Sequence, residues 1–402
     1  MGIANTSIQQ IRIGKQTAKG TILAAASVDA KLYNFVDATG NLAKDSFESN
    51  SIRTTQQRLN PRHGTRSVPF TLNQELQIGG HNDLVAGMLR AAFATAATTG
   101  SVSQAIDVTA RTLTRTTGSY ITDGFKVGDI VRITGSSDAD NDGVNLRLTD
   151  VTALVLTWAA DTWLPATMST VAAALITVAV PGKKCSIPSS SHTSDYFTIE
   201  DWQSDVPSSR RHTDCRVASM DIAIPPNGHA TIGTAFLGID SDPQATAWFT
   251  GPTAASTGAL LAGPQGLMRY NGTDSAVVSD VSINITNSAE VKSVVGTDLS
   301  PDVFVGSTVV TGSFSAMFDS NAFFTNFEAE TVAPLYIYLF EDSTAGSDFV
   351  CIKIPATKIN SSDSANDGVA RTVSANFSGG ENVDGSTTTE QTSIVYHDST
   401  AT

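Results

Sequence analysis

The sequence has few cysteines, few charged residues and few of the residues that favour helices. Its 402 residues include three cysteines, Cys185, Cys215 and Cys351, and this odd, widely spaced set indicates neither a disulfide framework nor a zinc site. We therefore expect buried, reduced thiols. Charged residues make up 16% and hydrophobic residues 41%, which is enough apolar material for a large core. Leu, Lys and Glu are sparse beside Thr, Ser, Asn and Gly, a balance that favours β-structure.

Basic charge and long apolar runs are also scarce. The net charge is −14, the first 115 residues or so are roughly balanced, and the acidity lies further along the chain. An acidic surface repels duplex DNA, so a protein that grips nucleic acid is not expected. The longest apolar stretch, "ATMSTVAAALITVAVPG", is too short and too rich in Ser and Thr for a membrane span and suits a buried strand. The opening "MGIANTSIQQIRIGKQ" lacks the apolar region of a signal peptide.

Composition divides the chain into zones. Residues 1–105 hold "SVPFTLNQELQIGG", whose alternation predicts a strand, and a predicted helix over Asp83–Phe93 with Asn82 as its N-cap. Residues 106–182 alternate short β-runs with Gly turns, which predicts a small all-β domain inserted into its surroundings. Residues 183–250 return to longer strands, and residues 251–266, rich in small residues, read as a linker.

Residues 267–402 repeat the order of the first zone and its continuation. A strand precedes a short helix at Asn321–Glu328, with Phe323, Phe324 and Phe327 expected on one side. The matched segments are "YFTIED" and "YIYLFED" (Glu200–Asp201 against Glu341–Asp342), Cys215 and Cys351, and "HATIGTAFLG" and "ARTVSANFSG" (Phe236 against Phe377). Five segments in one order indicate a duplicated unit, of which only the first copy is split by the insert.

No catalytic or nucleotide-binding motif is present, and the six histidines are scattered. "DADNDG" places Asp138, Asp140 and Asp142 at the alternate positions of a calcium loop, but the twelfth position is Thr149 rather than Glu. A hairpin tip explains these residues equally well. We therefore expect no enzyme, no catalytic residue, no cofactor and no metal site, with calcium at the three aspartates left open.

Two basic clusters and one tryptophan have both a functional and an ordinary explanation. "SSRRHTD" and "LNPRHGTR" would suit phosphate contacts, yet ion pairing with acidic neighbours is favoured by the net charge. Trp202 in "EDWQSD" suits either a partner anchor or a core position.

Several segments together resemble the major tail tube proteins of long-tailed, siphovirus-like phages. They are "RHGTRSVPFTLNQELQIGGHNDLVAGML", "YFTIEDWQSDV", "FVGSTVVTGSFSAMFDSNAFFTNFE" and "FVCIKIPATKI", and the insert is similar to small β-domains carried by tail proteins. The resemblance implies a mainly β fold, in which sandwich units with a flanking helix lend strands to a closed inner barrel. It also implies a structural virion protein, assembled in the host cytoplasm, that forms stacked rings as a conduit for DNA ejection.

The implied partners are further copies of the chain and the other tail proteins, namely the tape measure, the terminator and the distal tail protein, while DNA passes without specific binding and no membrane is involved. Six units usually make a ring, so two units per chain lead us to expect a homotrimer with pseudo-sixfold symmetry. Lumen strands are expected near residues 51–72, 213–224, 277–287, 303–318 and 348–359, with acidic side chains repelling phosphates. The insert is expected to project outward, and the N-terminal arm and "LAKDSFESNS" to join neighbouring rings.

Two other functions remain open at this stage. A receptor-binding or decoration protein that binds a host-surface glycan would show an aromatic-lined site on the insert and discrete trimers. A polysaccharide hydrolase would need paired carboxylates in a cleft. Glu200 and Asp201 are the one dense acidic pair within an expected strand, but adjacent strand residues point to opposite faces.

Overall fold

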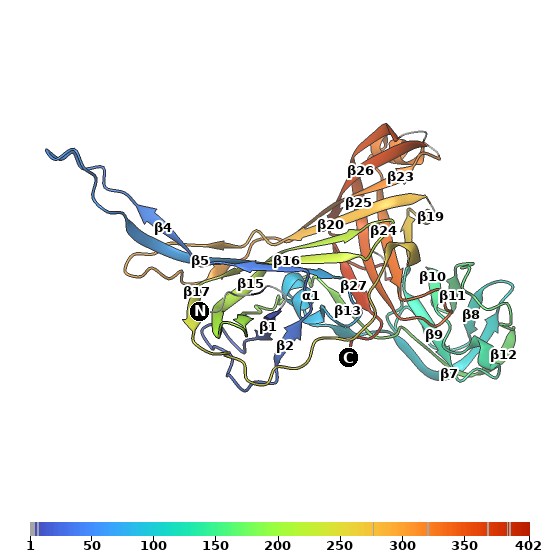
Figure 1. Cartoon of the computed structure of the whole chain (residues 1–402). Coiled ribbons are helices and arrows are strands. Elements are labelled where there is room, and N and C mark those ends of the chain that lie inside the picture. Colours follow the sequence, from blue (N-terminus) through green and yellow to red (C-terminus); the bar gives the residue numbers. More distant parts are fainter. Residues whose placement is uncertain are drawn as a thin grey trace.

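The structure is a computed structural model that describes residue 5 and residues 8–275, 277–319, 321–367, 370–383, 385 and 387–402. The prediction of a mainly β fold is confirmed, because the described residues form strands throughout and only two α-helices, α1 (Asn82–Leu89) and α2 (Ala322–Glu328). Most strands belong to one bent sheet of 19 strands, six others close a barrel, and two short ones form a separate ribbon (Figure 1).

The bounds of the strands follow from the backbone pairing. The large sheet contains β1 (Gln9–Lys15), β2 (Ala30–Tyr33), β3 (Asp37–Gly40), β4 (Ala43–Phe47), β5 (Arg62–Glu75), β6 (Ala94–Thr95), β13 (Lys183–Ser186), β14 (Phe197–Gln203), β15 (Ser208–Ile224), β16 (Thr231–Gly238), β17 (Asp240–Gln244), β18 (Gly266–Tyr270), β19 (Thr273–Ser275), β20 (Val278–Thr286), β23 (Val309–Met317), β24 (Val332–Phe340), β25 (Phe349–Asp367), β26 (Ala370–Gly380) and β27 (Val395–Asp398). The ribbon contains β21 (Glu290–Val291) and β22 (Val303–Phe304).

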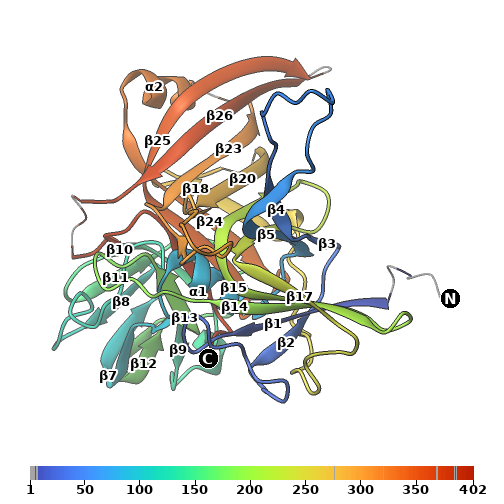
Figure 2. The same cartoon turned by 90° about the vertical axis from the view of Figure 1, so that its left-hand side faces the viewer.

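Eight of these strands pair one after another in an antiparallel run. The order is β3, β5, β16, β15, β20, β23, β26 and β25, in which the first four strands come from the first half of the chain and the last four from the second. Figure 2 shows this run as a curved surface from β25 and β26 to β5.

The two longest strands leave this run at their N-terminal ends and enter an outer layer. There β15 pairs with β14 and β17, and β14 leads on to β1 and β2. In the second half β25 pairs with β24 and β27, β24 leads on to β18 and β19, and β27 to β13 and β6. One large core lies between the run of eight and these outer strands, and it includes residues from both halves of the chain.

The two helices differ in how deeply they are buried. Helix α1 buries Leu84, Val85, Met88 and Leu89, and it packs on β15. Its predicted span and cap are partly wrong: the helix ends at Leu89 because Arg90 is left-handed, with φ of 56°, and the cap position is His81. In α2 Phe323 is buried and Phe324 is partly buried against the core, while Phe327, one turn after Phe323, is 39% exposed.

The six-stranded barrel has a core of its own. Its strands are β7 (Thr98–Asp107), β8 (Thr112–Arg115), β9 (Ile130–Thr134), β10 (Leu146–Val151), β11 (Val155–Trp158) and β12 (Val171–Ala179). Tyr120, Phe125 and Trp158 are buried inside it with aliphatic side chains from every strand. The longest apolar stretch of the sequence contributes Ile176 and Val178 of β12 to this core. Leu175, next to Ile176 on the same strand, points outward and is 68% exposed.

Candidate assembly surface

One face of the eight-stranded run is covered by small polar side chains. Successive residues of a strand point to opposite faces, so every second residue of each strand reaches this surface. They are mainly Ser, Thr and Asn, and they hydrogen-bond across neighbouring strands. The pairs are Thr39 with Thr71 at 2.8 Å, Ser282 with Ser313 at 2.8 Å, Ser315 with Ser374 at 3.1 Å, and Asn376 Nδ2 with Ser361 Oγ at 2.8 Å. The surface therefore presents a lattice of neutral hydroxyl and amide groups, which we call the hydroxyl face.

The charges on the hydroxyl face are mostly negative. Among the side chains that the structure describes, strand register places five carboxylates on it, those of Asp37, Glu75, Asp221, Asp280 and Asp363. Among the same side chains, register places two cationic groups there: the Lys358 ammonium, 2.6 Å from Glu330 Oε2, and the Arg216 guanidinium, which is buried and donates to the Val303 carbonyl. The face thus combines weak, neutral polarity with a modest excess of negative charge.

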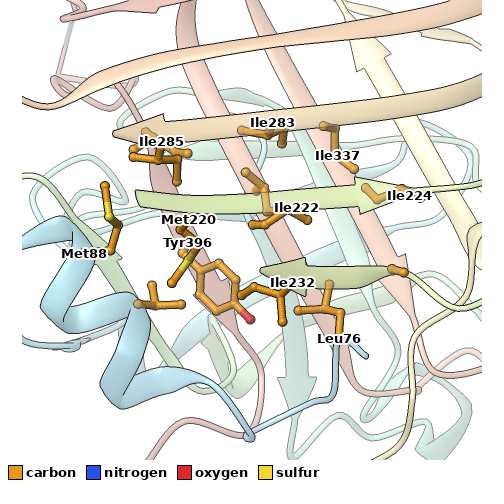
Figure 3. Close-up of a cluster of buried hydrophobic side chains, with 14 of the residues drawn as sticks. Leu76, Met88, Met220, Ile222, Ile224, Ile232, Ile283, Ile285, Ile337 and Tyr396 are labelled. Carbon is orange, nitrogen blue, oxygen red and sulfur yellow. The ribbon is translucent and has the colours of Figure 1, made fainter. Parts of the chain in front are cut away.

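The opposite face of the run is apolar and packed. Figure 3 shows Met220, Ile222 and Ile224 of β15 beside Ile283 and Ile285 of β20, where the two halves of the chain meet. Each half also has two phenylalanine rings in contact on this face, one pair edge to face and the other tilted. The pairs are Phe70 with Phe236, at 6.1 Å between centroids, and Phe314 with Phe377, at 6.2 Å. Burial of this face fixes the register of the strands that cover the core, because a shift by one residue would exchange the two faces.

The two halves of the run share a β-bulge in the same place. In β15 the bulge lies between Val217 and Ser219, opposite Phe236 of β16. In β25 it lies between Ile359 and Ser361, opposite Phe377 of β26. Counting onward from the bulges, Ser219, Asp221 and Ala223 occupy the same positions on the hydroxyl face as Ser361, Asp363 and Ala365. A bulge re-aims the strand locally, so its repetition is a structural feature rather than an accident of alignment.

An arm projects from the run beyond β3. It consists of β4, the segment 48–61 and the first residues of β5, with Phe47 paired opposite Arg62 (Figure 1, at the left). Its apolar side chains reach solvent, since Phe47 is 63%, Ile52 101% and Leu59 50% exposed. Exposed apolar side chains on a projecting arm are typical of a segment that docks on another molecule.

The barrel is docked against the outer layer of the second half. Ile130 packs with Tyr336, Tyr338, Phe340 and Phe349 in a separate small core, and Trp163 stacks on Phe340 with 4.7 Å between ring centroids. Gly128 makes this contact possible: its φ is 81°, and a Cβ there would lie 2.9 Å from the Tyr336 ring. Any side chain at this position would therefore push the barrel away from the sheet.

A buried charge cluster joins the same two parts. Asp129, which precedes β9, is fully buried and binds the ammonium groups of Lys184, at 2.6 Å, and of Lys353. Burial would raise the pKa of Asp129, but the two neighbouring ammonium groups outweigh it and hold that pKa well below the usual range. His397 beside the cluster has a pKa lowered to about 3, by burial and by Lys353 and Lys184, so its imidazole stays neutral. The cluster thus sets two ammonium groups, those of Lys184 and Lys353, against the Asp129 carboxylate, and Lys184 also contacts Glu390.

A scan of the sequence against known protein families finds one match, to the phage tail tube protein family, over residues 6–386. This chain belongs to that family. A search of curated proteins finds no matching relative. Membership makes the chain a structural component of the virion tail, and the mainly β fold is in keeping with it. Neither helix in the described part of the chain is long enough and apolar enough to cross a membrane.

Glu200 and Asp201, the acidic pair that a hydrolase would need, do not form an accessible pair of carboxylates. Glu200 in β14 is fully buried, and it accepts hydrogen bonds from Ser209 Oγ at 2.7 Å, from the backbone N–H groups of Trp248 and Phe249, and from Arg12. Its oxygens are therefore fully used in joining the outer strands. Glu341 and Asp342, the segment matched to this pair, lie in an exposed turn after β24. Neither site offers two carboxylates facing one cleft.

One arginine of each basic cluster forms ion pairs, as the net charge suggested. Arg66 contacts Asp298 at 2.7 Å and Asp240 at 2.9 Å. Arg211 contacts Asp242 at 2.8 Å and lies over the Trp248 ring. The three cysteines are free and buried, which confirms the prediction of reduced thiols. Trp202 is half-buried, with the Arg12 guanidinium 5.9 Å from the centre of its ring.

Two of the three aspartates of "DADNDG", Asp138 and Asp142, act as local caps. Asp138 accepts hydrogen bonds from the Asp140 N–H, in a short 3-10 turn, η2 (Ala139–Asn141), and from the Ser169 hydroxyl. Asp142 accepts from the N–H groups of Gly135 and Ser136. Among the described residues no group of three His, Cys, Asp or Glu side chains is placed to hold a metal ion.

Proposed function

We propose that this tail tube protein assembles with itself into rings that stack into the tail tube, with the hydroxyl face lining the bore. The observation that carries the proposal is the eight-stranded run itself, which is packed on one face, polar on the other and open at both ends. Closing such a run with other copies removes edges that would otherwise aggregate.

We further infer that the chain contains two tube units, and that three chains make a ring. Support comes from the matching strand order, the matching bulges and the repeated residues at 219–223 and 361–365. In this division the barrel is an insert in the first unit, which comprises residues 1–105 and 183–250, and residues 267–402 form the second unit after a linker at 251–266. The barrel strands themselves run from Thr98 to Ala179.

Three of the five ranges expected to line the bore overlap strands of the run. Residues 213–224, 277–287 and 303–318 overlap β15, β20 and β23 of the run. Two of the expected ranges fit the run only in part. Residues 51–61 are not a strand, whereas residues 62–72 belong to β5. Residues 349–354 of β25 pair with β24 and not with β26, and pairing with β26 begins at Ala356. The members of the run that the expected ranges missed are β3, β16, β26 and the second half of β25.

Ring dimensions follow from the strand count. Three chains with eight strands each give 24 strands, which at about 4.8 Å spacing and a tilt near 45° close a cylinder of roughly 50 Å across the backbone. Side chains of about 5 Å on each wall leave a bore of roughly 40 Å, wider than duplex DNA. Six chains per ring would double the circumference.

The bore would act on DNA physically and not by bond chemistry. Hydroxyl and amide groups bind phosphate weakly, and the five carboxylates per chain repel it, so no site holds the polyanion long enough to slow it. This role needs no catalytic group, no cofactor and no metal. DNA would pass through without sequence-specific contact, and the other partners would be the remaining tail proteins.

Reversing one lining charge tests this account of the bore. Asp280→Lys is expected to leave subunit folding intact, because Asp280 is exposed, and to make assembled tubes retain labelled duplex DNA at low salt. Retention should fall steeply as salt rises. The isosteric control Asp280→Asn should retain little DNA. Equal DNA retention by the wild-type, Asn and Lys tubes would contradict an inward-facing position for this residue.

Neighbouring rings would be joined by the arm at residues 43–66 and by the N-terminal arm, of which residues 1–4, 6 and 7 lie outside the described part of the chain. The barrel packs on the outer layer, away from the hydroxyl face, so in such a ring it would stand on the outside. The glycan-binding alternative has no support here. All of residues 98–179 are described, and the four aromatic side chains among them, Tyr120, Phe125, Trp158 and Trp163, lie in the barrel core or against the sheet.

Electron microscopy of the purified protein at high concentration tests the proposed function. We expect rings and hollow tubes with an axial channel. Compact particles without a channel, from intact protein with native-like circular dichroism, would contradict it.

A further inference from the structure

The two halves of the chain meet along one pair of strands of the run. Where β15 meets β20, six residue pairs are in antiparallel register, from Ser219 opposite Thr286 to Ile224 opposite Val281. On the hydroxyl face of this contact Asn284 Nδ2 donates a hydrogen bond to the Asp221 carboxylate. On the packed face Met220 and Ile222 meet Ile283 and Ile285 (Figure 3).

Both ends of the eight-stranded run are open. At one end, residues 37–43 pair with β5 and with no other strand in the described part of the chain. At the other end, the stretch of β25 from Asn360 to Asn366 pairs with β26 alone among the described residues. Figure 2 places these two edges at opposite ends of the curved surface. An open edge presents unpaired N–H and C=O groups that favour addition of another strand.

The first open edge has the register of β20 and shares an aspartate and an asparagine with it. Asp37 lies opposite Asn73 of β5 as Asp280 lies opposite Ser315 of β23, and Gly40 lies opposite Phe70 as Ile283 lies opposite Gly312. Continuing this register, "DATGNLA" at 37–43 aligns with "DVSINIT" at 280–286. Asn41 therefore takes the place of Asn284, and Leu42 the place of Ile285.

The second open edge repeats the register of β15 and its hydroxyl-face residues, while on the packed face Ser362 and Ser364 stand where β15 has Met220 and Ile222. The shared bulge aligns Ser361, Asp363 and Ala365 with Ser219, Asp221 and Ala223. Asp363 is exposed on the hydroxyl face. Its counterpart Asp221 accepts a hydrogen bond from Asn284 within the chain. Each open edge thus matches one side of the internal contact, with the asparagine on one edge and the aspartate on the other.

We propose that the edge at 37–43 of one copy pairs with the edge at 361–366 of the next, in the register that sets Asn41 opposite Asp363. This proposal rests on the proposed ring and specifies its joint. The pairs then run from Ala43 opposite Ser361 to Ala38 opposite Asn366. The Asn41 amide donates to the Asp363 carboxylate of the neighbouring copy, and Leu42, half-exposed in one chain, becomes covered on the packed face as Ile285 is.

A disulfide across the joint tests the register. Opposed residues of antiparallel strands have Cα atoms about 4.5–5.5 Å apart, within the range that a disulfide spans. The variant Asn41→Cys/Asp363→Cys, assembled and then oxidised, is expected to run as dimers and trimers on a non-reducing denaturing gel. The three native thiols are buried and give little background. The matched control Asp221→Cys/Asn284→Cys, the same pair within one chain, should form its disulfide and remain a monomer.

The outcomes separate the joint from the ring. Tubes that form normally, with a closed disulfide in the control and none between positions 41 and 363, would overturn the joint and leave the proposed function standing. Wild-type protein that forms no ring would overturn the proposed function itself. Pairing of position 41 with Ser361→Cys instead of Asp363→Cys would show a register shifted by two residues and would also overturn the proposal.

A charge exchange provides a second test that needs no oxidation. Asn41→Asp sets two carboxylates opposite each other at every joint, and like charges in that position are destabilising. We expect a several-fold rise in the protein concentration needed for assembly. Adding Asp363→Asn restores one amide and one carboxylate in exchanged order and should recover most of the loss. No recovery in the double variant, with both variants folded, would contradict the pairing of these two residues.

Discussion

Replacing Asp129 with asparagine is expected to lower the free energy of unfolding by about 3–5 kcal/mol, because it leaves two ammonium groups without their shared buried carboxylate. Lys353 is fully buried, and Lys184 keeps only Glu390, at 3.1 Å, as a second partner. Urea denaturation at neutral pH measures the loss. A matched control is Glu330→Gln, which breaks the exposed pair with Lys358 and should change stability little, since solvent screens it.

The same cluster makes stability depend on acid pH. The pKa of Asp129 is held below its unfolded value of 3.8, so its contribution is fully present above that value and is lost as pH falls below it, toward the folded pKa. Wild-type protein should therefore lose more stability between pH 5 and pH 2 than Asp129→Asn does. Parallel pH profiles for the two proteins would show that Asp129 is not ionised in the folded state.

Removing the tip of the arm is expected to abolish stacking while rings still form. Phe47 lies opposite Arg62, so residues 48–61 can be replaced by the two-residue turn Asn-Gly without changing the strand register. The shortened chain should keep the core of the wild type and its thermal unfolding midpoint. Electron microscopy should then show single rings in place of tubes.

A milder variant separates loss of contact from loss of chain length. Ile52→Ser/Leu59→Ser keeps the arm but removes two exposed apolar side chains, and it should shorten the tubes without preventing rings. The disulfide between positions 41 and 363 should still form in both variants, because the joint lies within a ring. Full-length tubes from the shortened chain would assign stacking to another segment.

Much of the run of eight was readable from alternation. The pattern of apolar and polar residues indicated strands at β5, β20 and β23. Phe236 of the first half corresponds to Phe377 of the second, because each lies opposite the residue before a bulge. Aligning the two halves on Cys215 and Cys351 does not bring residues 219–223 opposite residues 361–365. The reason is that β25 has more residues than β15 between its cysteine and its bulge. The signal that would have found it is Ser-x-Asp-x-Ala, present at 219–223 and at 361–365.

Other features have no local signal in the sequence. Asp129 and Lys353 are far apart in the chain, and nothing near either residue shows that the barrel and the second half bury them together. The change of sheet partners along β25 is also invisible, since the strand continues without a break from Phe349 to Asp367. The expected end of α1 was too late because Arg90, a good helix former, adopts a left-handed conformation.

The central claim is that eight strands per chain close into a 24-stranded cylinder with the hydroxyl face inward, and a helical reconstruction of assembled tubes by electron cryomicroscopy tests it most directly. The account predicts three chains in each ring, with Asn41 of one chain beside Asp363 of the next and Ser282, Ser313 and Asn376 facing the bore. Six chains in each ring, or those side chains pointing away from the axis, would contradict it.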